Sequence, residues 1–473
     1  MIKVKSKRPG DAHAYFELLR IYYPTYEAEG ADLVMTLVEE PDEDLVNVLF
    51  SDLGQVFFKS FKREDDPMDQ RHKVARWLAR DLKTDKKVPS KWGILTGTRP
   101  IKFAIKKGRG HSPEDLVDFL ATDYLVDRDL ADLLVAIAQL ELKEVGALSK
   151  KDYGLYINIP FCPSRCSYCS YPTLVSYQEA DQRTYLALLK KEMEGLFQEM
   201  AAYPAIIYIG GGTPTSLTTP LLGDLLDYIG SFSQGLENPE ITLEAGRPDT
   251  LDREKMALIS QSPVTRISIN PQTMSNSVLK GVGRPHSKED ILRTYDMARN
   301  LGMDNINMDL ILGLPGEDEA GFLDSLGQVI DLGPENITIH TLSFKNGSKL
   351  FEKTGIAIKN YSQLTNGAYA LCKKNAYDPY YLYRQKRIIG NGENIGYAKA
   401  GHTCLYNMMM MEELATVIGV GMSSTSKIRT YGQGPGGEIK KFSNYRNYRD
   451  YTEKIDEIIK KKAYVLKEMG WTR

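Results

Sequence analysis

The sequence of 473 residues lacks any apolar run near the roughly 20 residues that a helix needs to cross a bilayer. Its first thirty residues mix Lys, Arg, Asp and Glu and contain no apolar run of signal-peptide length. The sequence therefore predicts a cytoplasmic protein with no membrane span.

An excess of charge of one sign is also missing. The chain carries 60 Lys and Arg residues against 62 Asp and Glu residues, and its formal net charge is -2. A protein with this balance has no overall positive field to attract a nucleic acid or an anionic membrane. We therefore expect no nucleic-acid partner.

Cysteine is scarce, with five residues in the whole chain. Three of them lie close together in the segment 162–169, which does not suit a disulfide framework. In a reducing compartment, clustered thiols more often bind a metal or take part in catalysis. The scarcity of cysteine therefore directs attention to this one segment.

The first part of the chain predicts an N-terminal α+β domain of unknown role, residues 1–150. Segments 33–38 and 55–61 have the β-branched and aromatic content or alternation of strands. Segment 68–82 has helical spacing, and two further helices are expected between Ser112, a predicted N-cap, and Leu148.

Residues 151–350 alternate apolar strands with amphipathic helices, which predicts a parallel α/β sheet. The expected helices cover 179–201, 217–234, 251–262, 287–301 and 317–332, and the expected strands end near Ile159, Ile209, Glu244, Ile269, Asp309 and Thr341. Six strands rather than eight indicate a partial (β/α)6 barrel. Residues 351–473 lose this rhythm and predict a C-terminal α+β subdomain that covers the barrel or lines its mouth.

The three clustered cysteines, Cys162, Cys166 and Cys169, have the spacing CxxxCxxC directly after an expected strand. Active sites of barrels lie at the carboxyl ends of their strands. An iron–sulfur cluster normally takes four thiolates, so three thiols leave one iron open to bind and activate a small molecule. A structural zinc site, which usually needs a second cysteine pair, and inert core thiols are the alternatives.

A second motif, Gly-Gly-Gly-Thr-Pro-Thr at 210–215, follows the next strand. Glycines allow the backbone to approach a ligand closely, although the same residues also suit an ordinary turn. Further polar residues lie at or beyond later strands: Glu244, Gln272, Arg284 and Asp309. Singly, such residues usually cap a helix or pair with a neighbour, but together they suit a zwitterionic, ribose-bearing ligand.

These motifs resemble the radical S-adenosylmethionine superfamily. More narrowly, they are similar to the oxygen-independent coproporphyrinogen III oxidases, the HemN-like enzymes, and particularly to the HemZ-type coproporphyrinogen dehydrogenases. The resemblance is carried by the segments 156–162, 210–215, 266–272, 308–316, 381–386 and 390–397, together with the cysteine spacing.

The resemblance implies that Cys162, Cys166 and Cys169 ligate a [4Fe–4S] cluster and act in catalysis with Tyr156. It also implies contacts with S-adenosylmethionine at the matching positions, which are Tyr156, Tyr168, Gly211, Gly212, Thr213, Glu244, Gln272, Arg284, Asp309 and Ser343. In the family, a flavodoxin- or ferredoxin-type donor reduces the cluster, and a 5′-deoxyadenosyl radical then attacks a tetrapyrrole. The expected reaction converts propionates of coproporphyrinogen III to vinyls and gives protoporphyrinogen IX in anaerobic haem biosynthesis.

Two positions depart from the family's best-known decarboxylases. Tyr171 stands where those enzymes have a further cysteine, and Asn158 stands where they often have histidine. A haem chaperone or a radical enzyme that modifies haem on the same scaffold is therefore the alternative function. A plain interaction barrel with residual motifs is a third hypothesis.

On the substrate side, Arg384, Lys386 and Arg387 lie among tyrosines and suit the propionates of a tetrapyrrole, or equally a basic edge strand. His340 is a candidate axial ligand or proton donor, although a lone histidine is more often structural. Cys404 is a candidate for a substrate contact, with an inert buried thiol as the alternative.

Overall fold

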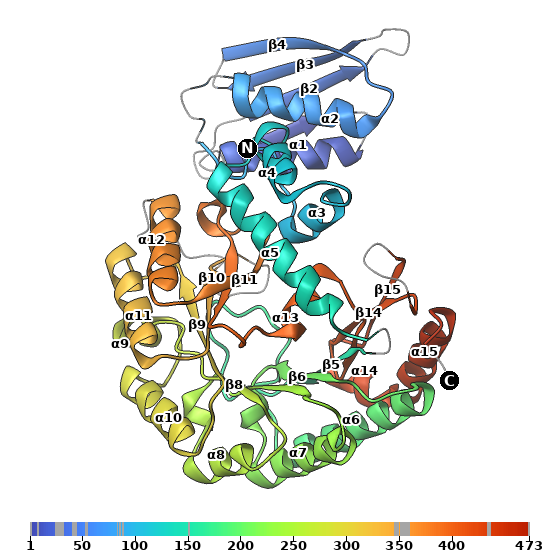
Figure 1. Ribbon diagram of the computed structural model, residues 1–473, viewed down its shortest axis with the longest axis vertical. Coiled ribbons are helices and arrows are strands. Elements are labelled where there is room, and N and C mark those ends of the chain that lie inside the picture. Colours follow the sequence, from blue (N-terminus) through green and yellow to red (C-terminus); the bar gives the residue numbers. More distant parts are fainter. Residues whose placement is uncertain are drawn as a thin grey trace. The chain divides into compact units, whose positions relative to one another are not determined.

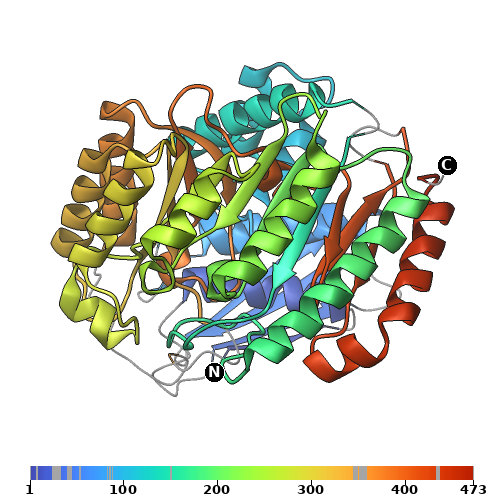
Figure 2. The same ribbon diagram turned by 90° about the horizontal axis from the view of Figure 1, so that it is seen from below.

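The computed structural model describes residues 2–6, 9–23, 33–39, 45–52, 55–82, 84, 87, 89–149, 152–344, 350, 360–432 and 437–471. The chain divides into two compact units, Met1–Ala136 and Ile137–Arg473, which are drawn in Figures 1 and 2. Each unit is described by itself.

The first unit contains a four-stranded sheet in the order β1 (Ile2–Lys5), β2 (Leu33–Glu39), β3 (Leu45–Asp52) and β4 (Gln55–Lys62). β1 pairs parallel with β2, and the other pairs are antiparallel. Alternate residues of β3, such as Val48 and Phe50, are fully buried in a core shared with α1 (Pro9–Tyr22). The two predicted strands are confirmed as β2 and β4, whereas β1 and β3 were not predicted.

The helices of this unit agree with the expected spacing. The predicted helix 68–82 is present as α2 (Pro67–Arg76) continued by a π-helical segment (Trp77–Asp81). After α3 (Pro100–Lys107), α4 (Pro113–Thr122) begins at the predicted N-cap, where Ser112 Oγ accepts a 3.1 Å hydrogen bond from the Asp115 amide. α5 (Arg128–Gly146) follows and ends within the second unit.

The second unit is built on one sheet of eleven strands. Its centre consists of parallel strands in chain order, which are β5 (Gly154–Ile159), β6 (Ile206–Gly211), β7 (Glu240–Glu244), β8 (Arg266–Ser268), β9 (Ile306–Leu312) and β10 (Asn336–Thr341). Every residue of β5 is buried, as expected for a parallel strand covered on both faces. This arrangement confirms the partial (β/α)6 barrel.

The helices between these strands lie on the outer side of the sheet (Figure 1). They are α6 (Glu179–Glu199), α7 (Thr219–Ser233), α8 (Arg253–Ser260), α9 (Asn276–Gly281), α10 (Lys288–Asn300) and α11 (Glu319–Leu332). All but the short α9 were predicted. Asp309 was expected to end its strand, but β9 continues through the apolar Leu310–Leu312 and ends before Gly313, whose φ is +97°.

The C-terminal residues extend the barrel sheet at both edges. β11 (Asp378–Tyr383) and β12 (Asn394–Ala398) add antiparallel strands beside β10. β13 (Val417–Val420) pairs parallel with β5 and is followed by β14 (Thr425–Arg429) and β15 (Ile439–Ser443). The remaining helices are α12 (Tyr361–Lys374), α13 (Leu405–Glu412), α14 (Tyr448–Glu453) and α15 (Ile455–Glu468).

Two features attach these C-terminal helices to the barrel. α13 packs against β11 and β6, and Figure 1 shows it at the open side of the barrel. α15 packs against α6 through a buried ion pair, in which Lys462 Nζ contacts Glu192 Oε1 at 2.5 Å. Within the described residues, no helix combines the length and apolar character that crossing a membrane requires.

Candidate functional site

The three clustered cysteines lie on the loop that follows β5, at the carboxyl end of the strand. This loop folds back on itself, because the Cys162 amide donates to Leu174 O at 2.9 Å and the Leu174 amide donates to Pro160 O at 2.8 Å. Cys162 and Cys166 are 9% and 8% exposed, Cys169 is more accessible, and all three thiols are free. The loop therefore presents three unpaired thiols within one compact turn.

The glycine-rich motif lies directly against the first cysteine. The Gly212 and Thr213 amides each donate at 2.7 Å to carbonyls of the Ile159–Phe161 segment, and Thr213 Oγ1 lies 3.3 Å from Cys162 Sγ. A Cβ atom at Gly212 would lie 2.6 Å from Phe161 O, which is too close for any other residue. The glycine is therefore required for the close approach of the two motifs.

Arg284 connects the cysteine loop to the segments that follow β7 and β8. Its Nε donates to Tyr168 Oη at 3.1 Å, and its Nη1 donates to Gly246 O at 3.1 Å and Asn270 O at 2.9 Å. Tyr168 and Arg284 both lie beside Cys166, and burial raises the pKa of the Tyr168 hydroxyl. A positive charge is thus held beside the thiols at a buried position.

Glu244, at the end of β7, is the central acid of the site. Its Oε1 accepts a 2.7 Å hydrogen bond from Tyr208 Oη, and its Oε2 accepts one of 3.2 Å from the Gly211 amide. Burial raises the pKa of this carboxyl to about 7, although both hydrogen bonds favour the charged form. Its protonation state therefore changes near neutral pH.

Gln272 lies beyond β8 in a left-handed backbone conformation, with φ at +68°. Its amide donates to Asp309 O at 2.8 Å, and its carbonyl accepts from the Ile311 amide at 2.9 Å, so the residue is fixed beside β9. Its side-chain Oε1 is buried and has no hydrogen-bond partner in the described part of the chain. Burying an acceptor of this kind costs free energy unless a ligand supplies a hydrogen-bond donor.

Asp309 is held in a chain of polar side chains across β9, β10 and β11. Asn307 Nδ2 donates to Asp309 Oδ1 at 2.8 Å, His340 Nε2 lies 3.7 Å from Asp309 Oδ2, and Tyr383 Oη lies 3.4 Å from His340 Nδ1. Burial opposes ionisation, but the pKa of Asp309 is nevertheless lowered by His340 and Asn307. Because both nitrogens of His340 face protein oxygens, neither is presented as an axial metal ligand.

An aromatic layer crosses the interior of the barrel below these polar groups. The ring of Tyr406, from α13, stacks on Tyr208 with centroids 4.3 Å apart and lies 6.0 Å from the ring of Tyr156. Sequence reasoning did not identify Tyr208 or Tyr406. That these two tyrosines line the barrel interior can be recognised only once α13 is known to enter the barrel.

Ser343 lies just beyond β10, paired with Ile388 in an isolated antiparallel bridge, and its hydroxyl donates to Gln385. The following Lys386 and Arg387 are exposed. Arg384 is buried instead, and burial lowers the pKa of its guanidinium to about 10. The three basic residues therefore do not form one exposed group.

The remaining cysteines lie apart from the thiol loop. Cys404 is buried, and its Sγ lies 3.4 Å from an oxygen of Glu240, which begins β7 at the opposite end from Glu244. Cys372 is fully buried on α12, and burial raises the pKa of both thiols to about 12. These observations favour the interpretation of Cys404 as an inert core thiol, and the same interpretation applies to Cys372.

The donor set at the carboxyl end of the sheet fits an iron–sulfur cluster with a bound zwitterion. It offers three free thiols, a buried amide oxygen that lacks a donor, and a carboxyl that ionises near neutral pH. Among the described residues, no three His, Cys, Asp or Glu side chains converge to hold one metal ion. A [4Fe–4S] cluster takes one thiolate on each of several irons and requires no such convergence.

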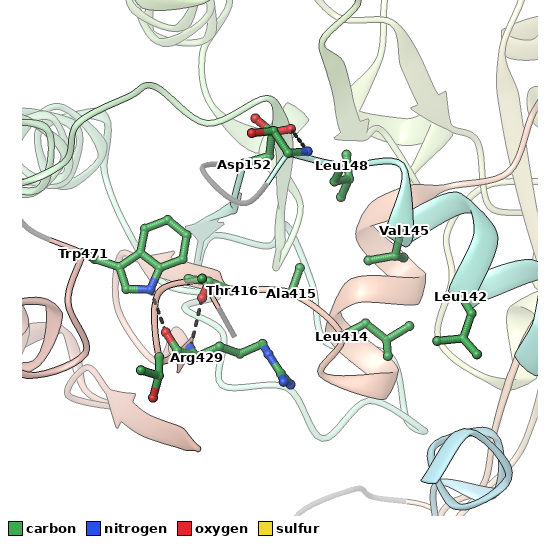
Figure 3. Close-up of a pocket in the computed structure, with 13 residues that line it drawn as sticks. Leu142, Val145, Leu148, Asp152, Leu414, Ala415, Thr416, Arg429 and Trp471 are labelled. Atoms are coloured by element: carbon green, nitrogen blue, oxygen red, sulfur yellow. Dashed lines mark hydrogen bonds between the residues drawn. The ribbon is translucent and has the colours of Figure 1, made fainter. Parts of the chain in front are cut away.

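A separate cavity of about 220 Å³ lies at the other end of the strands (Figure 3). Its walls include Leu142, Leu148 and Leu414, together with Trp471, whose Nε1 donates to Arg429 O at 2.6 Å. Thr416 and Asp152, which also line it, precede the amino ends of β13 and β5. This cavity is therefore distinct from the thiol loop.

Comparison with known proteins gives a family match over a segment that includes the thiol loop. Residues 156–329 match the Radical SAM superfamily. The oxygen-independent coproporphyrinogen-III oxidase-like protein HemZ of Bacillus subtilis is 40% identical over 395 residues, which cover 81% of this chain and 78% of HemZ. The heme chaperone HemW of the same organism is 34% identical over 191 residues, which cover 40% of this chain and 49% of HemW.

Among solved structures, the chain is similar to the coproporphyrinogen III oxidase HemN of Escherichia coli, which is a radical SAM enzyme. The TM-score is 0.51 at 20% sequence identity, and the match covers 68% of this chain and 72% of that chain. At this level of identity the similarity supports the fold.

Proposed function

Because this chain belongs to the radical S-adenosylmethionine superfamily and, within it, to the oxygen-independent coproporphyrinogen-III oxidase-like family, we propose that it is a radical enzyme that oxidatively decarboxylates coproporphyrinogen III. Members of the superfamily use a [4Fe–4S] cluster and S-adenosylmethionine. The observation that carries the proposal is the set of three free thiols on the loop after β5, packed against the glycine-rich turn.

In this proposal, Cys162, Cys166 and Cys169 hold the cluster. The cofactor contacts come from residues on the barrel strands and on the loops that follow them, which are Tyr156, Tyr168, Gly211, Gly212, Thr213, Glu244, Gln272, Arg284, Asp309 and Ser343. When bound, the cluster and S-adenosylmethionine would supply the one-electron chemistry that removes a hydrogen atom from the substrate propionate side chain. Loss of CO₂ to leave a vinyl group would then also require an acceptor for one electron.

In this proposal, the protein's own residues bind and orient the ligand. The free Oε1 of Gln272 accepts a hydrogen bond from the ligand, and the ionised Glu244 and Asp309 accept from its hydroxyl or ammonium groups. The stacked rings of Tyr208 and Tyr406 close the barrel interior below the site and exclude water from it.

Binding of a tetrapyrrole in this proposal depends on the exposed Lys386 and Arg387, which follow the strand β11 and lie on the segment paired with Ser343. Cations at this rim suit the propionate carboxylates of coproporphyrinogen III. The buried Arg384 supports the loop instead, through its hydrogen bond to Asn391.

We also propose a reducing, cytoplasmic setting and a flavodoxin- or ferredoxin-type electron donor. Five free cysteines suit a compartment in which thiols stay reduced. The net charge of -2 gives no general attraction to nucleic acids.

A second candidate function is binding or modification of haem on the same scaffold. It is favoured by the similarity to HemW and by Tyr171, which stands at the position of a further cysteine in the decarboxylases. The engaged nitrogens of His340 do not favour that residue as a haem ligand.

One anaerobic assay tests the proposal against the alternative. The holoprotein is incubated with S-adenosylmethionine and a reductant, and with either coproporphyrinogen III or haem. Mass detection of the vinyl product, with loss of CO₂, is expected for coproporphyrinogen III. Unchanged coproporphyrinogen III together with bound or altered haem would contradict the decarboxylation and favour the second function.

A further inference from the structure

Tyr156, Asn158 and Tyr171 form a polar cluster on the side of the thiol loop that faces β5. Tyr156 and Asn158 are two residues apart on this strand, so their side chains point to the same face of the sheet. Tyr171 returns from the loop, and its hydroxyl oxygen lies 2.6 Å from that of Tyr156. A hydrogen bond thereby connects Tyr156, which precedes the cysteine motif, to Tyr171, which follows it.

The hydrogen bonds of this cluster have a direction that follows from counting protons. Two hydroxyl protons are available, and Asn158 Oδ1 can only accept. Tyr156 Oη lies 3.1 Å from Asn158 Oδ1, whereas Tyr171 Oη lies 3.4 Å from it. The best-satisfied arrangement therefore has Tyr171 donating to Tyr156, and Tyr156 donating to Asn158.

Asn158 is itself held rigidly, which makes it a fixed acceptor. Its Nδ2 donates to Met422 O at 2.6 Å, so its Oδ1 must face the two tyrosines, and its backbone oxygen accepts from Tyr185 Oη at 2.6 Å. The side chain is completely buried. The position of the Tyr156 hydroxyl is therefore defined by the sheet and by Tyr171 together.

The same cluster touches two other parts of the site. A Cβ atom at Gly211 would lie 2.2 Å from Asn158 Oδ1, and the Gly211 amide donates to Glu244 at 3.2 Å. On the other side, the Tyr171 amide lies 3.4 Å from Cys169 Sγ. The cluster thus lies between the third cysteine and the glycine-rich turn.

We infer that Tyr171 is a positioning residue for the cofactor site, and that it acts through the Tyr156 hydroxyl to fix the Tyr156 ring beside bound S-adenosylmethionine. This inference rests on the proposed function, because it assumes that the ligand binds at the carboxyl ends of β5 and β6.

Two conservative substitutions test whether the tyrosines act as one unit. Tyr171→Phe and Tyr156→Phe, singly and combined, are prepared as cluster-loaded proteins, and the dissociation constant of S-adenosylmethionine is measured by equilibrium dialysis without reductant. Each single variant is expected to raise this constant about fivefold, as loss of one part-buried hydrogen bond predicts. The dissociation constant of the double variant is expected to equal that of the single variant that binds S-adenosylmethionine more weakly, because each substitution breaks the same interaction.

The matched control is Tyr203→Phe, since Tyr203 is an exposed tyrosine that precedes β6 and stacks on Phe232 away from the thiol loop. It is expected to bind S-adenosylmethionine as the unchanged protein does. Iron content and melting temperature are measured for every variant.

Three outcomes would overturn the inference. The first is that Tyr171→Phe binds S-adenosylmethionine with the dissociation constant of the unchanged protein. The second is that the effects of the two substitutions multiply, so that the double variant raises the constant about 25-fold. The third is a loss of iron or of thermal stability that accounts for the whole rise in the constant. Failure of the part of the proposed function on which this inference rests, the binding of S-adenosylmethionine, is recognised separately, because the unchanged, iron-loaded protein would then bind no S-adenosylmethionine at all.

Discussion

Cys162 Sγ lies 3.3 Å from Thr213 Oγ1, although the two residues are 51 positions apart in the chain. The contact joins the cysteine loop after β5 to the glycine-rich turn after β6. Adjacent parallel strands bring these two loops to the same edge of the sheet, and Gly212 removes the side chain that would hold them apart. The proposed metal ligand Cys162 and the proposed cofactor-binding turn therefore share one surface.

The first prediction concerns the middle cysteine. Cys166→Ser is expected to lower the iron content well below four per chain and to reduce cleavage of S-adenosylmethionine to background, because a hydroxyl is a poor ligand for iron. Iron analysis and the visible spectrum of anaerobically prepared protein measure the loss. Cys372→Ser, at a buried thiol on α12, serves as the control and should retain the cluster. Equal iron in the two variants would contradict the ligand assignment.

The second prediction concerns pH. Because burial raises the pKa of Glu244 to about 7, its carboxylate form is lost as the pH falls through 7, and this is the form that we propose accepts hydrogen bonds from the ligand. Affinity for S-adenosylmethionine should then fall by up to about tenfold per pH unit below that value. Glu244→Gln should bind about 10- to 100-fold more weakly and without this pH dependence. A titration at several pH values measures both effects, and an unchanged slope in the variant would exclude Glu244 as the titrating group.

The third prediction concerns stability and a carboxyl outside the site. Glu141 is fully buried on α5, and neither of its oxygens has a hydrogen-bond partner among the described residues. Burial, with Glu412 nearby, raises its pKa well above 4.5, so folding keeps it protonated and unfolding releases the proton. Stability is therefore lost as the pH rises above 4.5 towards the raised value.

Glu141→Gln keeps the shape of the side chain and removes the ionisation. We expect its free energy of unfolding near pH 8 to exceed that of the unchanged protein by about 1 kcal/mol or more. Denaturant melts at pH 6 and pH 8 measure the difference, with Glu144→Gln on the same helix as control. A variant that loses stability at both pH values would show that the carboxyl makes a needed contact.

The fourth prediction concerns the substrate rim. Lys386 and Arg387 are exposed beside Ser343, and replacing both by Ala should raise KM for coproporphyrinogen III about tenfold while leaving kcat nearly unchanged. The surface substitution Lys460→Ala on α15 is the control. Steady-state rates at several substrate concentrations provide the test, and a fall in kcat at constant KM would assign these residues a different role.

Much of the barrel could be predicted because its strands are continuous apolar runs with polar residues at their carboxyl ends. Ile159, Glu244 and Thr341 end their strands as expected. Asp309 did not, because the apolar residues after it continue β9. The local sequence pattern predicts the presence of a strand well, but the adjacent strands determine the residue at which strand pairing ends.

Other parts of the site depend on contacts that no local pattern contains. β13 joins the barrel beside β5 across more than 250 residues of chain, and α13 carries Tyr406 onto Tyr208. The pairing of Tyr171 with Tyr156 likewise needs the loop to fold back. Sequence spacing predicted candidate residues for the chemistry, and their role stays a prediction, whereas these partners emerge only from the tertiary packing.

The most direct test of the central claim is the release of 5′-deoxyadenosine by the full chain. Anaerobically reconstituted protein is reduced in the presence of S-adenosylmethionine, and the nucleoside is quantified by mass spectrometry alongside the iron content. The account predicts close to four irons per chain and release of 5′-deoxyadenosine that depends on the reductant. Full iron loading without any cleavage of S-adenosylmethionine would contradict it.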